Sequence, residues 1–256
     1  YFDMVGHPPV GSLLQSMEGW LYHHYGSYED SSAYKLCPLY IDDLEFGAGP
    51  PSISMLSRDP CAPTSNDGEV EVSCVIMDNS TIQEALVHYS IDGGDYQIVN
   101  MVSDGDSTFT GVISVSNGNT VYYYITATDD GVDQAEPKTS VYPYDINYDQ
   151  LGFHVTDDLT VKTIQETPWP SGNTLYEGCT VTLTGVVTAD TAQYESSYSS
   201  YALQDDEGQW NGIIFDLSVD ASEPIIMTRG DEVTVTGLVT DNDPDWIFKS
   251  GGNTRL

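Results

Sequence analysis

Polar and apolar residues alternate along much of this 256-residue chain, and this pattern most constrains its fold. Polar and apolar residues alternate at 69–75, and turns at Asp92-Gly93 and Asn117-Gly118 separate further alternating stretches at 85–90, 96–99, 109–113 and 120–128. Side chains of a strand point alternately to its two faces, and Asp-Gly and Asn-Gly turns join antiparallel strands. Strands that recur about every ten residues are typical of a two-sheet sandwich. The chain is therefore predicted to be all-β.

A second strand pattern follows a Pro- and Tyr-rich connector at residues 137–148. Short apolar stretches at 178–189, 201–205, 212–215 and 230–239 are spaced by glycines, which favours a small barrel. Near the amino end, residues 20–25 and 39–47 each predict a strand. We therefore expect three parts: residues 1–49, residues 50–156 and residues 157–256.

Three parts of the chain resemble known families. Val-His-Tyr-Ser-Ile-Asp-Gly-Gly-Asp-Tyr at 87–96 and Thr-Val-Tyr-Tyr-Tyr-Ile-Thr-Ala-Thr-Asp at 120–129 resemble immunoglobulin/fibronectin-III-like modules of large bacterial secreted proteins. That resemblance implies a spacer or adhesion unit without catalytic residues. The order Val-Thr-x-x-Gly-Val-Val-Thr, Ala-Leu-Gln-Asp, Gly-Ile-Ile-Phe and Gly-Asp-x-Val-x-Val-x-Gly in residues 181–237 is similar to the OB-fold-like domain that accompanies secreted nucleases and lamin-tail-type proteins. Ile-Asp-Asp-Leu-x-Phe at 41–46 resembles the end of a jelly-roll, carbohydrate-binding-type domain.

Charge excludes several classes of partner. The chain has 40 acidic and 7 basic residues, a formal net charge of −33. Nucleic acids and anionic membranes require clustered Lys and Arg, so neither is an expected partner, even for an OB-like barrel. No run of about 18 apolar residues is present, so membrane insertion is not expected. The acids are spread over all three parts, which favours a folded acidic surface over a disordered tail.

Calcium is the cofactor that this charge favours. Ca²⁺ takes six to eight oxygen ligands from carboxylates and backbone carbonyls. Four acidic clusters have the right composition for calcium ligation, and the two that we favour are Asp129, Asp130 and Asp133, and Asp241, Asp243 and Asp245; the others lie at 104–106 and 205–207. None of these clusters matches an EF-hand loop, and Asp side chains also cap ordinary turns. Adaptation to high salt is a further explanation of the acidity, so the three interpretations stay open.

The four cysteines indicate an oxidising environment, which favours an extracellular or cell-surface location. A disulfide between Cys61 and Cys74 would join the first two strands of the sandwich. Cys37 and Cys179 would then pair only if the first and third parts meet. Three pairings are open to four cysteines, and spacing alone does not choose among them.

The function that these patterns favour is a non-catalytic structural or adhesive subunit of an extracellular or cell-surface assembly, such as a filament. It would associate with itself or with neighbouring surface proteins and be stabilised by calcium. None of the five histidines lies in a nucleophile or metal motif, so we expect no enzyme activity. The alternatives are an accessory region of a secreted hydrolase, nuclease-like or glycan-active, and a carbohydrate-binding module that holds a glycan on Trp20, Tyr22 and Tyr25.

Overall fold

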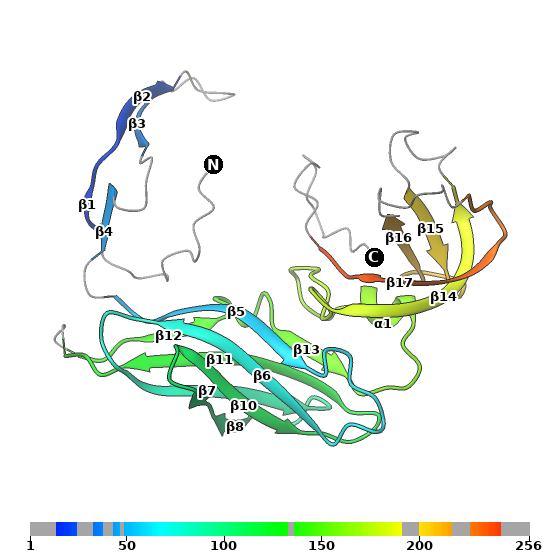
Figure 1. The fold of residues 1–256 in the computed structure, drawn as a ribbon, viewed down its shortest axis with the longest axis horizontal. Coiled ribbons are helices and arrows are strands. Elements are labelled where there is room, and N and C mark those ends of the chain that lie inside the picture. The colour runs from blue at the N-terminus through cyan, green and yellow to red at the C-terminus, as the bar shows by residue number, and fades with distance from the viewer. Residues whose placement is uncertain are drawn as a thin grey trace.

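The structure is a computed structural model, and it describes residues 14–24, 33–37, 43–46, 49–132, 136–190, 200–216 and 226–241. These residues form antiparallel sheets, as the alternation predicts, together with one short helix (Figure 1). Within them, no helix has the length and apolar character needed to cross a membrane.

Two antiparallel sheets form a β sandwich in the first large unit, drawn in cyan and green in Figure 1. One sheet has the order β5-β6-β10-β9, with strands Ser52–Asp59, Glu69–Met77, Thr108–Ser114 and Val102–Ser103. The other has the order β12-β11-β7-β8, with strands Thr139–Tyr142, Thr120–Asp129, Ile82–Ile91 and Gln97–Asn100, and β13 (Leu151–His154) also pairs with β11.

Alternation in sequence becomes alternation in burial. In β6, residues 70, 72, 74 and 76 are buried while their neighbours are partly or fully exposed. β11 alternates in the same way over its ten residues. Burying an aliphatic side chain contributes about 1.5–3 kcal/mol, so the shared core holds the sheets together. Its fully buried members include Val70, Val72, Ile76, Val87, Ile113, Val121, Ile125 and Phe153.

The tight turn after β7 confirms a specific prediction. Asp92 and Gly93 have φ values of 52° and 72°, and the Gly94 N–H donates to the Ile91 carbonyl at 2.9 Å. Two successive positive φ angles are the mark of the hairpin turn for which Asp-Gly is favoured. The Asp92 carboxylate also accepts from the Thr120 N–H at 2.8 Å, which ties the turn to the start of β11.

The second large unit is one sheet with the order β16-β15-β14-β17 and the helix α1 (Val161–Gln165). Its strands are Gly212–Asp216, Ser200–Gln204, Thr180–Ala189 and Glu232–Leu238. They enclose a second core around Leu183, Leu203, Ile213 and Phe215, onto which Val161 and Ile164 of α1 pack. Four of the expected strands are therefore present among the described residues. The helix was not predicted.

Two short ladders precede the sandwich: β1 (Leu14–Met17) pairs with β4 (Leu44–Phe46), and β2 (Trp20–His24) pairs with β3 (Ala33–Cys37). In Figure 1 they lie apart from both large units. The strand predicted at residues 39–47 is described only at Leu44–Phe46. The three-part division of the chain remains a prediction, as does the kinship of each part to a named fold family.

Candidate functional site

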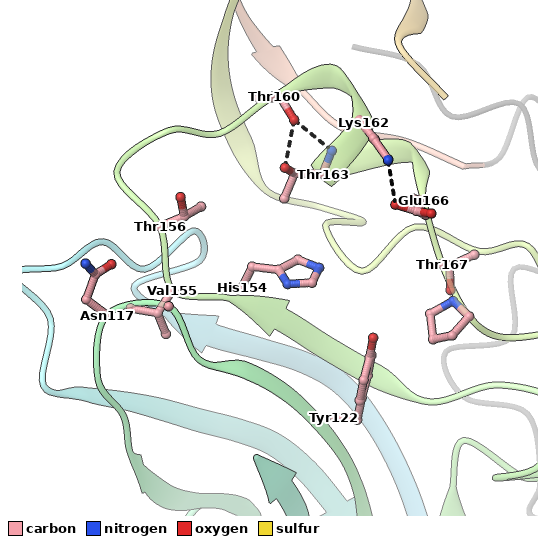
Figure 2. Close-up of a pocket in the computed structure, with 12 residues that line it drawn as sticks. Asn117, Tyr122, His154, Val155, Thr156, Thr160, Lys162, Thr163, Glu166 and Thr167 are labelled. Atoms are coloured by element: carbon pink, nitrogen blue, oxygen red, sulfur yellow. Dashed lines mark hydrogen bonds and ion pairs between the residues drawn. The ribbon is translucent and has the colours of Figure 1, made fainter. Parts of the chain in front are cut away.

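A cavity of about 630 Å³ lies where the sandwich meets the second unit (Figure 2). One wall comes from β11, β13 and the turn at Asn117-Gly118, and the other from α1 and the loop that follows it. Its principal side chains are those of Asn117, Tyr122, His154, Thr156, Thr160, Lys162, Thr163, Glu166 and Thr167.

His154 points into this cavity because side chains alternate between the two faces of β13. Phe153 enters the sandwich core, so the next residue along β13 faces outward. His154 lies opposite Thr120 of β11, and its Nδ1 is hydrogen-bonded to the Thr120 hydroxyl at 2.9 Å. Burial lowers the pKa of His154, the charge of Arg58 lowers it further, and Glu166 opposes both. The imidazole is therefore neutral at pH 7.

Tyr122 lies opposite Gly152 of β13, between the buried residues Val121 and Tyr123. Its ring meets the Trp169 ring edge-on, with centroids 5.5 Å apart, and packs on the core of the second unit. Burial raises its pKa, and the charge of Glu166 adds to the rise. In Figure 2 the phenol extends toward the space below α1.

The helix wall is built by local capping. Thr160 caps α1, because its hydroxyl accepts from the Thr163 N–H at 3.1 Å. The two threonine hydroxyls are themselves 2.8 Å apart. Lys162 and Glu166 form an ion pair of 3.7 Å one helical turn apart, with both side chains about half exposed. This wall therefore presents hydroxyls and one neutralised charge pair.

Next to the cavity, one arginine joins the two units. Arg58 of β5 donates to the carbonyl oxygens of Cys61 and Gly152, each at 2.6 Å, and to that of Leu175 at 2.8 Å. Its guanidinium also lies 5.3 Å from the ring centroids of both Phe153 and Tyr176. Planar guanidinium groups make such forked and stacked contacts together, which lysine cannot do.

A disulfide between Cys61 and Cys179 crosses the same junction and closes a loop of 118 residues. The prediction that Cys61 pairs with Cys74 is therefore wrong. The alternation of β6 turns Cys74 into the sandwich core, where it is a free, buried thiol, whereas Cys61 lies beyond the end of β5 and packs on the second core. Cys37 is also free, and it is exposed.

The described carboxylates of the two predicted calcium clusters serve turns and loops. Asp129 is buried, and its Oδ1 accepts from the N–H groups of Gly131 and Lys138, both at 2.9 Å. Asp130 accepts from the Val132 N–H at 3.1 Å. Asp241 accepts from the Thr174 N–H at 2.5 Å. Asp133, Asp243 and Asp245 lie outside the described residues, and within those residues no three His, Cys, Asp or Glu side chains are grouped to hold a metal.

The predicted sugar platform is described only in part. Trp20 of β2 is 70% exposed and lies opposite Cys37 of β3. The side chain of Tyr22 and all of Tyr25 lie outside the described residues. Whether these three aromatic side chains lie together as a platform therefore stays a prediction.

The side chains that shape the junction were missed from the sequence. Arg58 is one of only seven basic residues, and a lone base in so acidic a chain is the one signal that pointed to it. Tyr122 and His154 looked like ordinary outward residues of β strands, because their cavity also depends on α1, which begins 39 residues after Tyr122 and 7 residues after His154. Together these groups can hold a neutral polar ligand by hydrogen bonds and by ring stacking.

No protein-family model matches this sequence, and no curated protein matches it.

Proposed function

We propose that this chain is a non-catalytic structural or adhesive part of an extracellular or cell-surface assembly. The observation that carries the proposal is the junction of the two β units. Domains in one chain move relative to each other by default when their interface is small and polar. Here a disulfide, an arginine fork and shared packing hold one orientation.

A fixed joint suits a part whose task is to hold position. Catalysis at a domain boundary often needs a hinge that opens and closes, and this junction is locked covalently. The disulfide also supports an oxidising location outside the cytoplasm. Immunoglobulin-like and OB-like identities of the two units accord with this role and belong to the same proposal.

Sheet edges provide a route to assembly. Among the described residues, β16 and β17 each pair with one neighbour only, so each has a free side. Free strand edges pair with strands of other chains. The net charge of −33 opposes close approach of copies, and cations would relieve it.

Calcium is the cation that we propose for this role. Asp78 lies near Asp129 and Asp130: burial raises its pKa, and the two neighbouring charges raise it further. These three carboxylates are not grouped to hold a bound metal, so calcium would act here by screening their mutual repulsion.

Sedimentation velocity in chelator and then in millimolar calcium, at constant ionic strength, tests the proposal. Growth into oligomers with calcium is expected, and Mg²⁺ at equal concentration is the control for simple screening. A monomer in every buffer would contradict the assembly function.

The second candidate function is an accessory region of a secreted hydrolase, and the junction cavity favours it. Such a region would remain monomeric and bind its glycan or other substrate. The same centrifugation experiment therefore distinguishes the two candidate functions, since only the assembly subunit is expected to form oligomers with calcium.

A further inference from the structure

The junction cavity has the size and lining of a small-ligand site. Its volume of about 630 Å³ falls within the range of about 300–1,000 Å³ that is usual for such sites. The Tyr122 ring contributes an aromatic surface, and threonine hydroxyls, an imidazole and a carboxylate contribute polar groups. A polar cavity with one aromatic ring suits a ligand that has both C–H faces and many hydroxyls.

Two polar side chains in the cavity have hydrogen-bonding atoms that are available to a ligand. The Nδ1 of His154 is taken by Thr120, and no hydrogen bond from its Nε2 to the described residues is found. The same holds for the Tyr122 hydroxyl within that part of the chain. In Figure 2 both side chains extend into the space beneath the Lys162–Glu166 pair. A ligand there meets a donor-acceptor phenol, an imidazole nitrogen and a carboxylate oxygen.

The charges around the cavity favour a neutral ligand over an anion or a metal ion. Lys162 and Glu166 neutralise each other, and the chain as a whole is strongly negative, so an anion gains little locally and is repelled at long range. A bare metal ion would find one carboxylate that is already paired. A neutral polyhydroxylated molecule meets neither obstacle, because its hydroxyls can both donate to Glu166 and accept from Lys162.

We propose that this cavity binds a neutral saccharide unit, stacked on Tyr122 and hydrogen-bonded by Tyr122, His154 and Glu166. The inference rests on the proposed adhesive function, for which it names the ligand class. It also places the glycan at the junction of the two units and away from Trp20.

NMR of the isotope-labelled chain tests the site. The probes are the methyl glycosides of D-glucose, D-galactose, D-mannose and N-acetyl-D-glucosamine, with D-glucuronate as the charged counterpart of glucose. At least one neutral sugar is expected to shift the ring signals of Tyr122 and His154 saturably, and glucuronate to bind more weakly. Shifts confined to Trp20, or none with any neutral sugar, would overturn the proposal, as would tighter binding of glucuronate.

Matched variants locate the contacts. Tyr122→Phe removes one hydroxyl and is expected to weaken binding roughly three- to tenfold, the usual worth of one hydrogen bond. Glu166 is exposed directly after the end of α1, so Glu166→Gln keeps the fold and is expected to weaken binding similarly. Tyr144→Phe is the control, since Tyr144 is 71% exposed and not part of the cavity. Equal affinity in all three variants would refute the assignment.

Failure of the saccharide site can be distinguished from failure of the proposed function. Calcium-dependent oligomers without any sugar shift would overturn the saccharide site alone. A monomer that binds sugar through Tyr122 would support the site and contradict the assembly function.

Discussion

Arg58 donates from Nη2 to the carbonyl oxygen of Leu175 at 2.8 Å, although the two residues are 117 positions apart and belong to different β units. The same guanidinium reaches the Gly152 carbonyl at the end of the sandwich. A single side chain therefore satisfies backbone acceptors from both sides of the junction. The Cys61–Cys179 disulfide and His154 also lie at this junction, so the predictions on stability, thiol chemistry and pH below all concern it.

Replacing Arg58 with Met is expected to destabilise the chain by about 2–4 kcal/mol, because charged hydrogen bonds are lost and backbone carbonyls are left without donors. Chemical denaturation measures the change. Arg229→Met is the matched control, since Arg229 is exposed, and it should alter stability by less than about 0.5 kcal/mol. Equal effects of the two substitutions would show that the Arg58 fork carries no stability.

Thiol labelling checks the disulfide. In the native chain a thiol reagent is expected to modify Cys37 quickly and Cys74 only slowly, because Cys74 is buried and burial raises its pKa to about 12. Peptide mapping after denaturation without reductant should find label on these two cysteines alone. Label on Cys179 would indicate a different pairing.

The double variant with Cys61→Ser and Cys179→Ser is expected to lose about 2–5 kcal/mol of unfolding free energy, since the disulfide closes a loop of 118 residues. Denaturant unfolding of both forms measures the loss. Cys37→Ser is the control and should unfold like the parent chain, because Cys37 is a free, exposed thiol. A double variant of parental stability would contradict a structural role for the bridge.

Gly152→Ala tests the close contact between β13 and β11. A Cβ at residue 152 would lie 2.6 Å from the Val121 carbonyl oxygen, so the backbone that also accepts from Arg58 would have to shift. A loss of about 1–3 kcal/mol is expected in thermal or chemical unfolding. Gly68→Ala has no atom within 4 Å of its new Cβ and should be neutral or slightly stabilising. The opposite ranking would contradict the contact.

The two half-buried histidines, His88 and His154, predict a loss of stability in mild acid. Burial lowers the pKa of His154 and of His88 below the ordinary value of 6.5, so the unfolded chain takes up these protons first. The stabilising contribution of each histidine is complete above pH 6.5 and falls as the pH drops through 6.5 toward its folded pKa. NMR titration of the imidazoles gives both folded values, and a His154 pKa above 6.5 would contradict the prediction. In unfolding experiments His154→Gln should flatten the dependence of stability on pH between 7 and the folded pKa.

Local features of the sandwich were predictable because strand burial repeats with a period of two. Residues 69–77 show the alternation directly, and the structure buries the apolar member of each pair. The Asp92-Gly93 turn was readable for a similar reason, since few residues other than Gly tolerate a positive φ. Absence of clustered bases likewise follows from the sequence alone.

The sequence by itself therefore determined the all-β class, the main strands and turns, and the acidic surface, since these depend on neighbours along the chain. Only the tertiary structure decided that Cys61 pairs with Cys179, that Arg58 spans both units, and that Tyr122 and His154 face α1 across a cavity. Each of these relationships includes residues that are distant in sequence, as Tyr122 is from both His154 and α1. Local periodicity carries no information about such partners, because they meet only when whole sheets pack against each other.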